Sequence, residues 1–133
     1  MDNEDYEVLI KYGKTAFSND CNWKDNECII WNGSASFTRM DLLVIYKINR
    51  MFELNLITEE QSRSLMDLYE RYLMLEDDLL YSEYDQEKED EFETIYRRLA
   101  ELHLLPDSVT LGYLMDDSIK NDSGYRLLLE EKK

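Results

Sequence analysis

Residues that interrupt helices are scarce in this chain, which has one proline and four glycines among its 133 residues. Proline removes a backbone donor and glycine costs conformational entropy, so a chain with few of either can form long helices. Hydrophobic residues make up 44% of the sequence, which is too many for a disordered acidic chain and enough for the apolar core of one domain. The sequence therefore predicts a mainly α, single-domain protein.

Two capping boxes mark helix starts in the middle of the chain. The Thr38 hydroxyl can accept a hydrogen bond from the backbone amide of Asp41, and Thr58 and Gln61 repeat this pattern. Apolar residues recur at helical spacing after each box. The stripe after Thr38 is wide enough to predict a central helix that is covered on several sides. The short joint between the two helices predicts an antiparallel helical hairpin.

The remaining segments are assigned from breaks and turns. A break at 81–85 precedes a third helix at 86–105, which Pro106 is expected to end. Asn32-Gly33 between two short apolar runs predicts a β-hairpin, whereas residues 5–17 fit either a helix or a short strand. The expected fold is a bundle of about four helices with a short N-terminal β-hairpin. The single domain, 1–133, divides into a less regular part at 1–37, a helical core at 38–105, and a C-terminal helix and tail at 106–133.

Negative charge is concentrated in the second part of the chain. Thirty acids and fifteen bases give a formal net charge of −15, and the residues from Thr58 onward, with twenty-one acids and nine bases, account for −12 of it. Such a chain is repelled by nucleic acids and by anionic membranes, so neither is expected as a direct partner. A protein with a basic, nucleic-acid-binding surface is the expected partner.

The densest acidic tract, 76–93, holds ten acids and one base, Lys88. As one continuous helix it would span ~27 Å. That gives about one net negative charge per 3 Å, near the ~3.4 Å phosphate spacing along a nucleic-acid strand. Like-charge pairs four residues apart each oppose helix formation by ~0.2–0.5 kcal/mol, which favours a use for the tract beyond solubility. The competing interpretation is a solvated face, which charge runs usually form.

Two tyrosines lie inside this tract. Tyrosine is enriched at interface hot spots, and an aromatic ring flanked by carboxylates suits an arginine-rich partner. We therefore expect the tract to bind a partner as one outward-facing negative ridge. The candidate binding residues are Glu76, Asp77, Asp78, Tyr81, Glu83, Tyr84, Asp85, Glu87, Asp90 and Glu91.

Patterns for catalysis or metal binding are weak. His103 is the only histidine, and Cys21 and Cys28 are too far apart in sequence for a zinc knuckle and too few for a disulfide scaffold. The chain has no Glu-x-x-His pair, no nucleophile elbow and no phosphate-binding glycine loop. We expect no enzymatic activity, no cofactor and no metal, and leave open whether the two cysteines pair.

The N-terminal residues lack the basic and apolar regions of a signal peptide, and the longest apolar run, 42–46, is too short to span a membrane. A cytoplasmic protein is expected.

The preferred hypothesis is a small inhibitor or immunity-type protein that occludes the basic nucleic-acid site of a partner enzyme by nucleic-acid mimicry. Phage counter-defence proteins and nuclease immunity proteins share this character. The alternative is a non-catalytic assembly or adaptor protein, such as a homodimer joined through 40–55 and 59–80, whose acids serve solubility only. A carboxylate-bound metal hydrolase ranks third.

Overall fold

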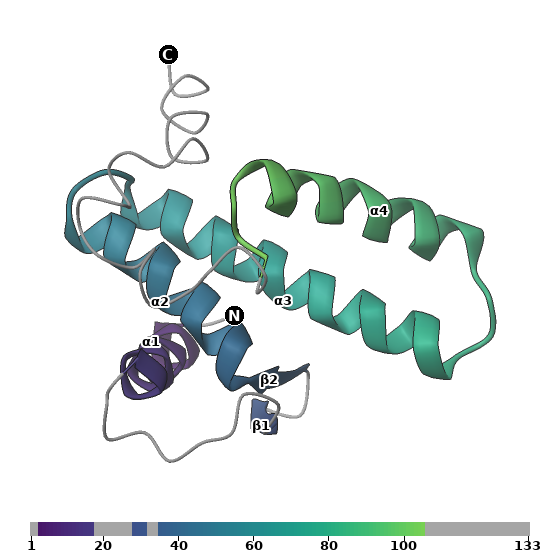
Figure 1. The fold of residues 1–133 in the computed structure, drawn as a ribbon, viewed down its shortest axis with the longest axis horizontal. Coiled ribbons are helices and arrows are strands. Elements are labelled where there is room, and N and C mark those ends of the chain that lie inside the picture. Colours follow the sequence, from purple (N-terminus) through teal and green to yellow (C-terminus); the bar gives the residue numbers. More distant parts are fainter. Residues whose placement is uncertain (1–2, 18–27, 32–34, 106–133) are drawn as a thin grey trace.

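The computed structural model describes residues 3–17, 28–31 and 35–105 (Figure 1). The protein is mainly α-helical, as predicted, with four helices and one β-hairpin in the described residues. The C-terminal helix and tail expected at 106–133 lie outside them, as does Cys21. The elements are α1 (Asn3–Phe17), β1 (Cys28–Trp31), β2 (Ala35–Thr38), α2 (Arg39–Glu53), α3 (Glu59–Tyr81) and α4 (Gln86–Glu101).

The central helix is α2, which packs against α1 and α3. It begins at the predicted capping box, where the Asp41 amide donates to the Thr38 hydroxyl at 3.2 Å and the Thr38 amide donates to the Asp41 carboxylate at 2.9 Å. Thr58 and Gln61 begin α3 in the same way. Burial on several sides of α2 confirms the covered helix that the apolar stripe predicted. The buried apolar residues are Leu42, Leu43, Val44, Ile45, Ile48 and Met51.

A left-handed turn ends α2 and leads into α3. Asn55 has a φ of 61°, its amide donates to the Phe52 carbonyl, and the Leu56 amide donates to the Met51 carbonyl. These two bonds satisfy carbonyls that the end of a helix would otherwise leave without partners. Asparagine adopts this conformation more readily than most residues. The short joint expected between the two helices is therefore present.

The N-terminal segment contains a fifteen-residue helix, α1, so the expectation of a less regular part at 1–37 is wrong for these residues. Tyr6, Leu9 and Gly13 are buried at helical spacing, which gives α1 one packed face. Gly13 allows a close approach to α2, because a Cβ at this position would lie 3.2 Å from the Leu42 carbonyl oxygen.

The predicted β-hairpin is confirmed. β1 and β2 pair antiparallel, with Cys28 opposite Thr38 and Trp31 opposite Ala35. The Asn-Gly turn between them lies outside the described residues. Phe37 is buried, and β2 leads directly into α2 while also contacting α3.

The α3 and α4 helices form a hairpin whose far end extends beyond the rest of the described fold (Figure 1). A loop at 82–85 joins them, as the predicted break indicated. The buried residues of α3 lie at or before Leu75, and those of α4 are Ile95 and Leu99. The far end of the hairpin therefore lies outside the main core.

The third predicted helix ends earlier than expected, at Glu101 rather than at residue 105. His103 has a φ of 56°, and the amides of His103 and Leu104 donate to carbonyls of the last helical turn. A continuing helix would point Leu102, Leu104 and Leu105 in different directions, whereas this turn buries all three. The helix therefore ends before the position that Pro106 predicted, at a turn that buries three leucines.

Lys47 joins α2 to this turn. Its side chain is only 2% exposed, and its Nζ donates to the backbone carbonyl of His103 at 2.9 Å. The bond satisfies a carbonyl of the turn after α4, and it places a positive charge near the C-terminal end of α4, where the helix dipole favours it. The base of the α3–α4 hairpin is thereby attached to the central helix.

Candidate protein-interaction site

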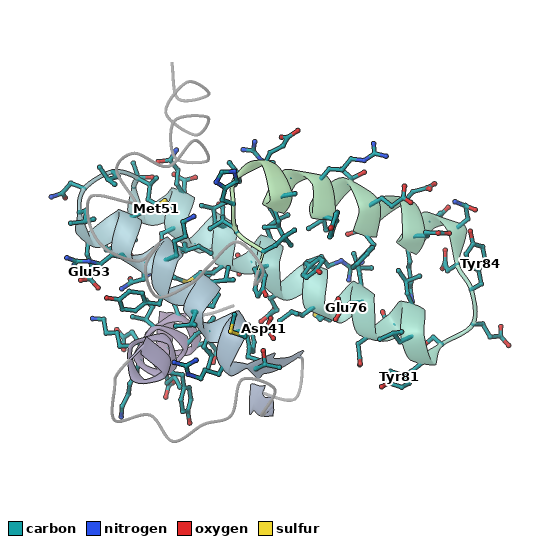
Figure 2. All side chains as sticks on the ribbon, in the orientation of Figure 1. Asp41, Met51, Glu53, Glu76, Tyr81 and Tyr84 are labelled. Atoms are coloured by element: carbon teal, nitrogen blue, oxygen red, sulfur yellow. The ribbon has the colours of Figure 1, made fainter. Side chains whose placement is uncertain are left out.

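The candidate site is the far end of the α3–α4 hairpin, residues 76–93, which we call the hairpin end. It comprises the last part of α3, the loop at 82–85 and the first half of α4, and it contains all ten residues singled out from the sequence. Figure 2 places Tyr81 and Tyr84 at this end, Tyr81 beside α3 and Tyr84 beside the start of α4. The structure therefore brings the candidate residues to one end of the molecule, but not onto one face.

The expected single negative ridge is not formed. The chain reverses at 82–85, so the two halves of the tract run in opposite directions instead of along one line. Successive residues of a helix point about 100° apart, so Glu76, Asp77 and Asp78 face different directions. The carboxylates surround the hairpin end, and the comparison with the phosphate spacing of a nucleic acid does not hold.

The reversal also changes the like-charge pairs that the sequence suggested. Because residues 82–85 form a loop, only the pairs Glu87/Glu91 and Glu89/Glu93 lie within a helix. Arg71 offsets the first of these pairs by binding Glu91. The cost of the tract to folding is therefore smaller than the sequence alone predicted.

Two carboxylates of the hairpin end pair with described cations across the hairpin. Arg71 binds Glu91 through two bonds, Nε to Oε1 at 2.8 Å and Nη2 to Oε2 at 3.0 Å, and Lys88 Nζ lies 3.4 Å from Asp78. The hydrogen bond from Arg71 lowers the pKa of the Glu91 carboxyl. Exposed pairs of this kind contribute at most about 1 kcal/mol each, but they connect the helices where few residues are buried.

Other acids serve the local structure. The Asp85 carboxylate caps α4 by accepting from two backbone amides at 3.0 and 3.3 Å. Glu89 accepts a hydrogen bond from the Tyr84 hydroxyl, which raises the pKa of Tyr84. Burial raises the pKa of Tyr72, with Glu76 adding to the shift through its charge and a hydrogen bond. Asp90 accepts from the side-chain amide of Gln86 at 2.9 Å.

Three exposed acids among the candidate residues have no such role in the described part of the chain. Within that part, the carboxylates of Asp77, Glu83 and Glu87 form neither an ion pair nor a hydrogen bond. They come from α3, the loop and α4 respectively. Their charges are therefore directed to solvent or to a partner.

The hairpin end also carries large exposed apolar side chains: Leu80 is 69% exposed, Tyr81 82% and Tyr84 69%. Aromatic residues such as tyrosine are enriched at protein-interaction surfaces. Leu80 is not among the residues that the sequence singled out. The signal was the run Leu79-Leu80-Tyr81, because three consecutive residues of a helix cannot all face the core.

Comparison with known proteins does not relate the chain to any of them. No protein-family model, curated protein or solved structure matches it. Within the described residues, no helix is long and apolar enough to cross a membrane, and no group of three His, Cys, Asp or Glu side chains is placed to hold a metal ion.

Toward the base of the hairpin, a cluster of three aromatic rings connects α3 and α4. The ring centroids of Tyr72 and Phe92 lie 5.2 Å apart, and Tyr96 lies 6.4 Å from each. Tyr96 is 46% exposed although its ring packs against both of the others. It borders a shallow depression of about 300 Å³ that is lined by Phe92, Glu93, Tyr96 and Arg97.

The apolar interface proposed for the alternative function is not exposed along α2. The apolar face of α2 is covered by α1 and α3 within the described fold. On α3, the residues packed into the core likewise face inward, and Leu80 is the strongly exposed apolar residue of the range 59–80. The hairpin end thus remains the preferred place for a partner.

Proposed function

We propose that this chain is a small acidic inhibitor or immunity-type protein that inserts its hairpin end into the basic nucleic-acid site of a partner enzyme. The observation that carries the proposal is the projecting end of the fold, where ten acids accompany one base, Lys88, and the ion pairs of the described residues add Arg71 from the neighbouring part of α3. Exposed apolar side chains at the same end supply contact area.

The first step of binding is electrostatic attraction. The whole chain carries a formal net charge of −15, which accelerates its encounter with a basic surface. At ordinary ionic strength, salt screens the attraction between exposed charges that lie more than about 10 Å apart. The association rate should therefore fall as salt is added.

The shape of the hairpin end favours a concave partner surface. Two helices side by side measure about 20 Å across, and the exposed last part of α3 extends roughly 9 Å. Asp77, Glu83 and Glu87 come from three different parts of this end, so the walls of a groove contact them better than a flat surface does. Inhibition then comes from blocking the groove, and it does not require a row of carboxylates that imitates phosphates.

Two triple variants test the place of binding. The end triple carries Asp77→Asn, Glu83→Gln and Glu87→Gln, and the control triple carries Glu4→Gln, Glu7→Gln and Glu60→Gln. All six acids are exposed, and each triple removes three negative charges. Each protein is immobilised and exposed to a lysate of its native host. Bound proteins are eluted with duplex DNA or with salt, identified by mass spectrometry and assayed for inhibition.

The proposal predicts that wild type and the control triple capture a nucleic-acid enzyme at low salt, release it to DNA and inhibit it. The end triple should lose most of this capture and inhibition. Equal losses in both triples would show that only total charge matters. Capture of metabolic enzymes alone, or of nothing, would count against inhibition of a nucleic-acid enzyme.

A further inference from the structure

The last turn of α3 presents an apolar step to solvent, formed by Leu80 and Tyr81, which are 69% and 82% exposed. Within the described residues, the Tyr81 side chain has no hydrogen bond and no ring contact. Figure 2 shows it pointing away from the hairpin. Both the face and the edge of its ring are therefore open to a partner.

The surroundings of this step are strongly negative. Asp77 precedes Tyr81 by four residues, so the two side chains are neighbours on the helix surface, with Cβ atoms about 5–6 Å apart. The last turn of α3 contains no basic residue, although the C-terminal end of a helix carries partial negative charge. An uncompensated carboxylate, the helix end and an exposed ring thus lie together.

We propose that this turn docks an arginine-bearing segment of the partner protein. The guanidinium stacks on the Tyr81 ring and pairs with Asp77, while the methylene groups of the arginine contact Leu80. The inference rests on the proposed function in one respect, that the partner is basic.

Charge and geometry favour this occupant over others. A second copy of the chain would bring another net charge of −15 to the same surface. A lysine provides charge but not the planar group that stacks on a ring and forms paired bonds to a carboxylate. Arginine is the side chain that uses all three features of the turn.

The test measures binding of an oligoarginine peptide, and of an oligolysine peptide of equal length, to the full chain by calorimetry. Wild type should bind oligoarginine more tightly than oligolysine. Tyr81→Ala should weaken oligoarginine binding about two- to fivefold, since an exposed cation–π contact has this size, and should weaken oligolysine binding less. Tyr81→Phe keeps the ring and should behave as wild type, as should Val8→Ala, which trims an exposed apolar residue of α1.

Equal binding of the two peptides to wild type, or an unaltered oligoarginine affinity in Tyr81→Ala, would overturn this inference. The outcome is separable from that of the proposed function. If the end triple loses inhibition of a host enzyme while Tyr81→Ala does not affect peptide binding, the function stands and the docking turn fails. If Tyr81→Ala selectively loses oligoarginine but no host enzyme is inhibited, the docking turn stands and the function fails.

Discussion

At the scale of single residues, Asp41 shows how one side chain can serve both a helix start and the core. One carboxylate oxygen accepts from the Thr38 amide and hydroxyl, at 2.9 and 3.0 Å. The other accepts from the Tyr69 hydroxyl of α3 at 2.5 Å, in a buried position. The bonds to Thr38 follow from a local sequence pattern. The bond to Tyr69 does not, because 28 positions separate the two residues and only the packing of α2 on α3 brings them together.

Replacing Tyr69 by Phe removes a donor from the buried Asp41 carboxylate, so the free energy of unfolding should fall by about 1–3 kcal/mol near neutral pH. Urea denaturation followed by circular dichroism measures this loss. Leu80→Ala at an exposed position provides a control and should change stability far less. A variant as stable as wild type would mean that the bond contributes nothing net.

The same variant should be less sensitive to alkali. Burial, together with Asp41, raises the pKa of Tyr69 well above 10, so the folded state keeps a proton that the unfolded state releases. The stability from this shift is complete below about pH 10 and is lost as the pH rises further, by up to ~1.4 kcal/mol per pH unit for each such tyrosine. Tyr69→Phe keeps Tyr6, whose pKa is raised to about 12 by burial and by Asp67. Part of the fall in stability with pH should therefore remain in this variant. Identical slopes for both proteins between about pH 9 and 11 would contradict this account.

At the scale of helices and strands, the features that the sequence predicted correctly are the ones set by nearby residues. The capping boxes at Thr38 and Thr58 and the Asn-Gly hairpin depend on residues within a few positions of each other. The predicted end of α4 was wrong, because the helix ends at a turn that buries leucines against the rest of the fold. The region of the candidate site was predictable from composition, but its arrangement was not. The Arg71–Glu91 pair across the hairpin joins residues 20 positions apart.

Gly13 lets α1 approach the backbone of α2 closely. A Cβ at Gly13 would lie 3.2 Å from the Leu42 carbonyl oxygen and 3.3 Å from the Tyr46 amide nitrogen, and both are backbone atoms. Gly13→Ala should therefore lower the free energy of unfolding by about 1–3 kcal/mol through overpacking, despite the better helix propensity of alanine. Thermal unfolding measures the effect. Glu7→Ala on the exposed face of α1 is the control and should be nearly neutral. A gain in stability for Gly13→Ala would show that α1 can shift at little cost.

At the scale of the whole molecule, the buried core and the densest charge occupy different places. The core gathers around α2, whereas the acids of 76–93 surround the far end of the hairpin. Changes at the hairpin end should therefore affect partner binding strongly and folding weakly.

Mutual repulsion among these acids should make stability rise with added salt. The melting temperature of wild type is expected to increase from low to high sodium chloride, because screening weakens repulsion between exposed charges. The melting temperature of the end triple should increase less with salt than that of wild type. At low salt the end triple should be slightly more stable than wild type, by less than about 1 kcal/mol. The control triple separates local from total charge. If it responds to salt as the end triple does, the repulsion is spread over the whole molecule.

The bond from Lys47 to the carbonyl of His103 and the packing of α3 on α2 hold the base of the hairpin, while its far end extends beyond the rest of the described fold. A force that a partner applies to the hairpin end would be transmitted to this base. We therefore expect the orientation of the hairpin end to depend on residues at its base, far in sequence from those that would touch a partner. A change of Lys47 should then reorient the hairpin end while leaving its own residues unchanged.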